Sequence, residues 1–241
     1  MDEPVVSLTD VRAVYEGERH ATLEGVTMHV TRGEQVAITG PNGAGKTTIL
    51  EVINGLLPIT SGSVRVLGEA VTRDSHHLRS QIAYVPQNLF FTPDTPFLVR
   101  DVVTAARFGR IGRWQLPGPA DRAQVDVALE AVGMTFAAGR PIGRLSGGQQ
   151  RKVLLARAVA QEASLLLLDE PTANLDPVSK HEVADLVASI RATLDATSIV
   201  VSHESGPLLG ASDRVVALDA GRIVDNSSDA DLEDAIVLQG A

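Results

Sequence analysis

Cysteine is absent from the 241-residue chain, and aromatic residues make up only 3% of it. Without cysteine the chain can form neither a disulfide framework nor a thiolate metal site, which fits a reducing compartment. No stretch approaches the roughly 18 consecutive apolar residues of a membrane-spanning helix. The N-terminus is acidic (Met1-Asp2-Glu3-Pro4), whereas a secretory signal begins with basic residues. We therefore expect a soluble intracellular protein.

Basic residues are also scarce, with 21 Lys and Arg against 30 Asp and Glu and a formal net charge of −9. This balance argues against a nucleic-acid-binding surface, but not against a nucleotide held by one local loop. Only three of the basic residues are lysines (Lys46, Lys152 and Lys180), so a lysine inside a glycine-rich loop stands out. The length allows one large domain or two small ones.

A glycine-rich loop runs from Gly40 to Thr48 and has the pattern G-x-x-x-x-G-K-T. The apolar, β-prone residues 36–39 precede it, and a helical pattern follows from Thr47 to Ile53, with a stop at Asn54-Gly55. Glycine lets the backbone approach an anion closely, and a helix N-terminus offers free N–H groups and a positive dipole end. The pattern predicts a phosphate-binding loop, in which Lys46 reaches the β- and γ-phosphates and Thr47 binds Mg²⁺. The alternative is a glycine-rich turn that binds nothing.

Two carboxylates follow a short apolar segment, Leu165 to Leu168. This segment predicts a buried strand that carries Asp169 and Glu170 to its C-terminal edge, where ligands bind in open α/β sheets. Asp169 suits Mg²⁺, directly or through water, and Glu170 suits a general base that polarises an attacking water. Alternatively, both acids merely end the strand before Pro171. The phosphate-binding loop favours the catalytic interpretation.

The pentapeptide L-S-G-G-Q at Leu145 to Gln149 precedes a predicted helix. Its small residues and backbone donors could form a second anion site at a helix N-terminus. Composition alone favours a simpler interpretation, in which Ser146 caps the helix after a glycine turn.

The periodicity predicts an α/β fold with three parts. Strands at Val5 to Val14, Leu23 to Val30 and Val64 to Leu67, the last after a turn at Thr60 to Ser63, form an N-terminal antiparallel β subdomain. A mostly helical block runs from about Val99 to Gln161, and the alternation of strands and helices implies a mostly parallel sheet core. The C-terminal part is expected to hold a hairpin around residues 219–221 and a weak acidic helix at residues 229–238.

Together, the loop and the L-S-G-G-Q pentapeptide make the chain resemble the ATP-binding-cassette family, specifically the ATPase subunit of a membrane transporter. The resemblance covers nearly the whole chain. It implies a P-loop NTPase fold, with residues 1–241 as a single ATPase domain and a helical subdomain at about 89–161 inserted in the core. It also implies ATP and Mg²⁺ as cofactors.

The resemblance assigns further site residues by position. Tyr15 resembles the aromatic residue that stacks on adenine, Gln87 the glutamine that senses Mg²⁺, and His203 the histidine that contacts the γ-phosphate. The expected catalytic residues are Glu170, His203 and Gln87, and the expected Mg²⁺ residues are Thr47, Gln87 and Asp169. The expected nucleotide-binding residues are Tyr15, Gly40, Pro41, Asn42, Gly43, Ala44, Gly45, Lys46, Thr47, Thr48, Ser146, Gly147, Gly148 and Gln149.

The family also implies partners. We expect an ATP-dependent, head-to-tail homodimer in which the loop of one subunit and Ser146 of the other enclose each ATP. The dimer would lie on the cytoplasmic face of the membrane, bound to integral membrane permease subunits that work with an extracytoplasmic substrate-binding protein, and no nucleic acid would be involved.

The stretch from Tyr84 to Arg110, together with Pro141 to Arg144, resembles the branch that imports manganese, zinc, iron or metal chelates. Three alternatives remain open: a transporter of another cargo or an exporter, a non-transport cassette ATPase acting on ribosomes or DNA, and a P-loop kinase. Tandem cassettes, coiled-coil insertions or basic extensions would favour the second, but the chain has none. The third leaves the pentapeptide and His203 unexplained.

Overall fold

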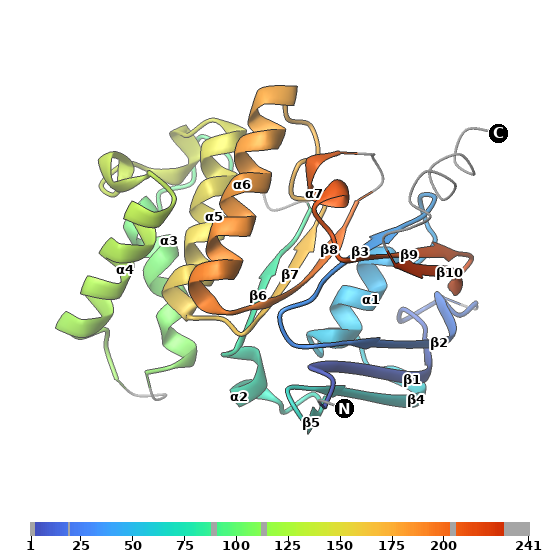
Figure 1. Ribbon diagram of the computed structural model, residues 1–241. Coiled ribbons are helices and arrows are strands. Elements are labelled where there is room, and N and C mark those ends of the chain that lie inside the picture. The colour runs from blue at the N-terminus through green and yellow to red at the C-terminus, as the bar shows by residue number, and fades with distance from the viewer. Residues whose placement is uncertain (1–2, 19, 88–90, 112–114, 203–205, 229–241) are drawn as a thin grey trace. The chain divides into compact units, whose positions relative to one another are not determined.

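The computed structural model describes residues 3–18, 20–87, 91–111, 115–202 and 206–228, which form two compact units (Figure 1). The first unit comprises Met1–Arg79, Leu167–Glu170 and Thr197–Ala241, and the second comprises Ser80–Leu166 and Pro171–Ala196. The boundaries of the inserted helical subdomain, at about 89–161, stay a prediction. His203 and the expected helix at 229–238 lie outside the described residues.

The elements largely follow the expected order. The strands are β1 (Val6–Ala13), β2 (Leu23–Val30), β3 (Gln35–Thr39), β4 (Ile59–Val66), β5 (Glu69–Ala70), β6 (Ile82–Val85), β7 (Leu165–Asp169), β8 (Thr197–Val201), β9 (Arg214–Asp219) and β10 (Arg222–Ser228). The α-helices are α1 (Lys46–Ile53), α2 (His76–Arg79), α3 (Val99–Thr104), α4 (Pro119–Ala131), α5 (Gly147–Gln161), α6 (Pro177–Leu194) and α7 (Pro207–Gly210). Three short 3₁₀ helices are η1 (Ala105–Gly109), η2 (Thr135–Ala137) and η3 (Ile142–Arg144).

The first unit contains the expected antiparallel sheet, in the order β2-β1-β4-β5. β1 pairs antiparallel with both β2 and β4, and its residues Val6 and Leu8 are fully buried, so one face of the sheet contributes to the core. The predicted turn at Thr60 to Ser63 is wrong, because β4 continues through these residues. Gly62 has a φ of 87°, and a Cβ there would lie 2.3 Å from the backbone oxygen of Asp10. The glycine thus marks a close approach of two strands where their register shifts, rather than a chain reversal.

The second sheet has the order β10-β9-β3-β8-β7-β6, and Leu167–Asp169 of β7 belong to the first unit. β3 lies between β8 and β9 and pairs in parallel with both. Every residue of β3, β7 and β8 is buried, as expected for strands covered on both faces. β9 and β10 form the expected hairpin, in which Ala220 and Gly221 both have positive φ, as a type I′ turn requires.

Within the first unit, helix α1 lies between the antiparallel sheet and the strands β3, β8 and β9 (Figure 1), and contacts β1, β4 and β8. Its residues Ile49, Leu50 and Ile53 are fully buried. Full burial of such a side chain contributes about 1.5–3 kcal/mol, so these three anchor the helix along its length. The phosphate-binding loop is therefore supported by rigid elements at both ends.

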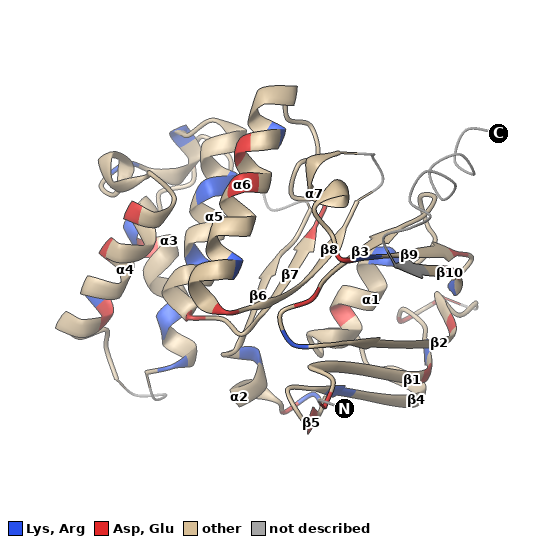
Figure 2. Cartoon of the chain, in the orientation of Figure 1, with Lys and Arg blue, Asp and Glu red and all other residues tan. Residues whose placement is uncertain are grey.

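The second unit is built around α5, which packs against α3, α4 and α6. Arg107 ties η1 to this bundle, since its guanidinium donates to Asp121 at 2.9 Å and to Glu162 at 2.7 Å. Figure 2 shows residues of both charge signs on α4 and α6, and Lys152 of α5 pairs with Glu182 of α6 at 2.8 Å. Among the residues that the structure describes, no helix is long and apolar enough to cross a membrane.

Candidate functional site

The glycine-rich loop connects the C-terminal end of β3 to the first residue of α1, as the sequence predicts. Gly40 has a φ of 141°, and a Cβ at this position would lie 2.0 Å from the carbonyl oxygen of Leu218. Gly45 is the N-cap of α1 with a φ of 101°, and its Cβ would lie 2.8 Å from the carbonyl oxygen of Thr22. Both positions therefore require glycine. The N-cap has no side-chain hydrogen bond, so the first N–H groups of α1 keep their capacity to bind an anion.

Lys46 is the first residue of α1 and is only 6% exposed. Its Nζ donates to the carbonyl oxygens of Gly40 at 2.7 Å and Pro41 at 2.9 Å, so the ammonium is held against the loop. Burial lowers the pKa of Lys46, while the negative charges of Glu170 and Asp169 oppose that shift. A cation fixed in this position can bind the phosphate groups of a nucleotide.

Thr47 and Asp169 meet at the start of α1. The Thr47 hydroxyl donates to Oδ2 of Asp169 at 2.9 Å, and Asp169 is 2% exposed. Its other oxygen, Oδ1, is buried and has no hydrogen-bond partner within the described part of the chain. Burial, with the charges of Glu170 and Glu51, raises the pKa of Asp169, against the Thr47 hydrogen bond and Lys46.

A hydroxyl oxygen next to an unsatisfied carboxylate oxygen fits the oxygen ligands of a hard divalent cation. The described residues contain no cluster of three or more His, Cys, Asp or Glu side chains that could hold a metal ion. A cation at Thr47 and Asp169 would therefore need further ligands from phosphate groups and water, which is how Mg²⁺ usually binds at nucleotide sites.

Glu170 directly follows β7 and adopts a left-handed backbone conformation, with a φ of 45°. Its N–H donates to the carbonyl oxygen of Val201 in β8 at 3.0 Å, and the residue is 7% exposed. A left-handed conformation is uncommon for glutamate and costs of order 1 kcal/mol, so the surrounding sheet must enforce it. Because its charge acts on Lys46, the Glu170 carboxylate lies near the loop.

Tyr15 follows β1 and is partly exposed. Its hydroxyl donates to Oε2 of Glu51 at 2.7 Å and lies 3.2 Å from the Thr48 hydroxyl oxygen. The structure thus brings Tyr15, the loop, Asp169 and Glu170 together in the first unit. Glu51 is a polar residue at this site that sequence reasoning missed. Its position three residues after Thr48, on one face of α1, was the available signal.

The remaining expected residues lie in the second unit. Gln87 follows β6, and Ser146 is the N-cap of α5. The Ser146 hydroxyl accepts from the Gln149 backbone N–H at 3.3 Å, while the Gln149 side chain accepts from the Ser146 N–H at 3.1 Å. The Ser146 cap is the arrangement that composition alone favoured, and the reciprocal contact of Gln149 completes a capping box. It leaves Ser146 and Gly147 exposed, so the cap does not exclude an additional contact with an anion.

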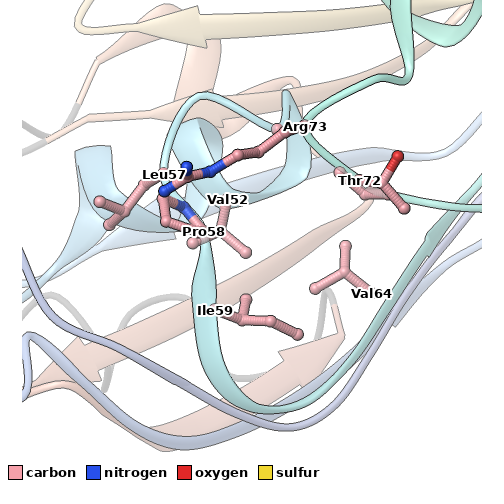
Figure 3. Close-up of a pocket in the computed structure, with 9 residues that line it drawn as sticks. Val52, Leu57, Pro58, Ile59, Val64, Thr72 and Arg73 are labelled. Carbon is pink, nitrogen blue, oxygen red and sulfur yellow. The ribbon is translucent and has the colours of Figure 1, made fainter.

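A small pocket elsewhere in the first unit includes no residue of the loop (Figure 3). It has a volume of about 150 Å³ and is lined mainly by apolar residues. The lining comprises Val52, Gly55, Leu57, Pro58, Ile59, Val64, Val71, Thr72 and Arg73. Because the lining includes no residue of the constellation around Lys46, this pocket forms no part of the candidate site.

Comparison with known proteins identifies relatives that cover most of the chain. The family model described as ABC transporter matches residues 23–173. The manganese transport system ATP-binding protein MntB of Halalkalibacterium halodurans is 39% identical, over 89% of this chain and 83% of its own length. The zinc transport system ATP-binding protein TroB of Treponema pallidum is 36% identical, over 92% and 81% of the two chains.

A solved structure of a dimeric bacterial ABC transporter cassette has a TM-score of 0.80 and 25% identity, and covers 92% of this chain and 98% of that chain. The sequence relatives and this structural neighbour both extend over most of the chain and agree with the family model. The chain therefore belongs to the ABC transporter family, as one of its ATP-binding ATPase subunits.

Proposed function

We propose that this ATPase subunit powers the import of a transition-metal ion or metal chelate through a separate membrane permease. The observation that carries the ATPase chemistry is the constellation around the loop, which consists of the buried Lys46, Asp169 and Glu170 and the partly exposed Thr47. Support for the cargo comes from the relatives that are named for manganese and zinc transport. Manganese, zinc and iron are the metals to test.

Each residue of the constellation has a distinct role in this proposal. Lys46 and the N–H groups of the loop hold the phosphates of ATP, and Tyr15 stacks on the adenine. Thr47 and Asp169 would hold Mg²⁺, together with Gln87. Bound Mg²⁺ neutralises charge on the phosphate oxygens. Glu170 accepts a proton from the attacking water, and His203 contacts the γ-phosphate.

The proposal includes a head-to-tail homodimer in which Ser146, Gly147, Gly148 and Gln149 of one subunit contact the ATP held by the loop of the other. The exposed Ser146 and Gly147 at the N-terminus of α5 support this, since that helix end offers backbone donors to an anion. We further propose that the dimer binds the permease at the cytoplasmic face of the membrane, and that an extracytoplasmic protein delivers the cargo.

The ATPase part is tested with Glu170→Gln, compared with wild type in the purified subunit and in the complex with its permease. Glutamine keeps the shape of the side chain but cannot accept a proton from water. General-base catalysis contributes about 10²–10⁴-fold, or roughly 3–5 kcal/mol of barrier, so hydrolysis should fall by that factor while ATP binding persists. The variant should also form a stable dimer in Mg-ATP but not in Mg-ADP. Turnover within a few-fold of wild type would remove Glu170 from the mechanism.

The cargo part is tested in a strain that lacks this gene. Growth should become sensitive to chelation of manganese, zinc or iron, and one of these metals should restore it. Re-expression of the wild-type chain should also restore growth, and re-expression of Glu170→Gln should not. Indifference to all three metals would refute metal import and favour another cargo or export.

A further inference from the structure

The connection between β1 and β2 is attached to α1 through the side chain of Tyr15. Its hydroxyl contacts two residues of that helix, Thr48 at 3.2 Å and Glu51 at 2.7 Å. These two residues are three apart and so lie on one face of α1. The same helix begins at Lys46, the cation of the phosphate-binding loop. The contacts therefore fix the tyrosine relative to the loop.

The contact with Glu51 is the stronger of the two. A hydroxyl that donates to a carboxylate makes a charge-assisted hydrogen bond, which is shorter and about twice as strong as a neutral one. The Thr48 hydroxyl is farther away, and Thr48 itself is 3% exposed. Burial, together with the hydrogen bond and charge of Glu51, raises the pKa of Tyr15 to about 12, although the Thr48 contact opposes this shift. The phenol thus stays protonated and able to donate.

We propose that Glu51 is a positioning residue for base recognition, which holds the Tyr15 ring where it meets the base of a bound nucleoside triphosphate. This inference rests on the proposed function, because it takes Tyr15 as the residue that stacks on the base. When the ring is held at a fixed place beside the loop, one nucleotide can contact the ring with its base and the loop with its triphosphate. The ring then loses little side-chain entropy on binding. Glu51 therefore favours nucleotides over ligands that contain phosphate alone.

A competing role must be separated from this one. The charge of Glu51 also contributes to the raised pKa of Asp169, so a substitution could act through the cation site at Thr47 and Asp169. An effect at that site would alter the binding of any triphosphate. An effect through Tyr15 would alter only ligands that carry a base.

The test measures dissociation constants by calorimetry for ATP and for inorganic tripolyphosphate, each with Mg²⁺. The variants are Glu51→Ala, Glu51→Gln, Tyr15→Phe and the double variant Tyr15→Phe/Glu51→Ala, with Glu69→Ala as an exposed control on β5. Glu51→Ala and Tyr15→Phe should each weaken ATP binding by about 5- to 10-fold, since each removes a charge-assisted hydrogen bond. Tripolyphosphate binding should change by less than about two-fold, as neither variant alters the loop. The double variant should be no weaker than either single one, and Glu51→Gln, which still accepts from the phenol, should recover most of the loss.

Three results would overturn the proposal: an equal loss of ATP and tripolyphosphate binding in Glu51→Ala, additive losses in the double variant, or no loss at all. Lys46→Ala separates this outcome from a failure of the proposed function. If Lys46→Ala loses both ligands while Glu51→Ala binds ATP normally, the site stands and only the role of Glu51 is wrong. If wild type binds ATP no more tightly than tripolyphosphate, the stacking role of Tyr15 is wrong, and the role proposed for Glu51 falls with it.

Discussion

Replacing Asp169 by asparagine should stabilise the nucleotide-free protein while it removes the response to Mg-ATP. Asp169 is 2% exposed, and its Oδ1 has no partner among the described residues. A buried polar group without a partner costs about 1–3 kcal/mol, and more when it is charged. Asparagine removes the charge and keeps an oxygen that can accept from Thr47, although its amide hydrogens then need partners. We expect a net gain of about 1 kcal/mol, which corresponds to about 2–4 °C in Tm for a chain of this size.

Thermal and urea unfolding with and without Mg-ATP provide the assay. A ligand at 100 times its Kd stabilises a protein by about 2.7 kcal/mol, which exceeds the expected gain from the substitution. Asp169→Asn should therefore be more stable than wild type without nucleotide and less stable with Mg-ATP. Asp185→Asn, which changes an exposed carboxylate on α6, should shift stability by less than about 0.5 kcal/mol in both conditions.

The pH dependence of the free energy of unfolding provides a second check on whether Asp169→Asn stabilises the nucleotide-free protein. The pKa of Asp169 is raised by burial and by the charges of Glu170 and Glu51. A raised carboxyl pKa means that the folded state loses stability as the pH rises from the ordinary value, near about 4, through the folded pKa. The advantage of asparagine should thus be largest above the folded pKa and vanish in acid. A nucleotide-free Asp169→Asn protein that is less stable than wild type at neutral pH would refute this reasoning, and would mean that the Thr47 contact outweighs the buried charge.

Four further predictions concern single residues. Lys46→Ala should abolish ATP binding in calorimetry and leave the far-ultraviolet circular dichroism unchanged, because it removes the cation fixed at the loop. Ser146→Arg should block ATP-driven dimerisation in size-exclusion chromatography without weakening ATP binding by the monomer. Gly40→Ala should cost about 2–4 kcal/mol in urea unfolding because its Cβ would meet a carbonyl oxygen at 2.0 Å, whereas Gly139→Ala, in open space, should cost less than about 0.5. Burial opposes ionisation of Glu34, but its hydrogen bonds to Arg214 and Thr31 lower its pKa overall. Glu34→Gln should therefore lower the free energy of unfolding by about 1–2 kcal/mol at neutral pH. In urea unfolding at decreasing pH, this loss should vanish as the pH falls through the lowered pKa.

The elements around the loop could be predicted because their signals are local. β3, α1 and β7 each follow from a few adjacent residues, such as the apolar run before Asp169 and the Asn54-Gly55 stop. The predicted turn at Thr60 to Ser63 failed for the opposite reason. Serine and glycine signal a turn within the segment itself, but here β1 supplies the hydrogen bonds and Gly62 accommodates a close strand. Pairing with a distant strand overrode the local preference.

The side-chain contacts at the site could not be predicted from the sequence, because they also join residues far apart in the chain. Tyr15 and Glu51 are 36 positions apart, and neither belongs to a motif that would require the other. Only the packing of α1 near the end of β1 brings the phenol to the carboxylate. Ser146 differs, because its capping of α5 could be predicted from composition and is seen in the structure. Capping is only one of its two expected roles. Its contact with a second subunit stays a prediction.

The candidate site is costly to the folded chain, and this cost itself indicates function. Glu170 has a left-handed backbone, Asp169 keeps a buried oxygen without a described partner, and Lys46 is buried against two carbonyl oxygens. Each feature is unfavourable by itself, and an apolar residue at Asp169 or Glu170 would suit a buried strand end better. A chain that needed only stability would not place these groups together. Phosphate oxygens beside Lys46 would compensate the buried ammonium, and a divalent cation at Asp169 would compensate the buried carboxylate. On the proposed function, the same features that lower the stability of the empty site would supply part of the free energy for binding Mg-ATP.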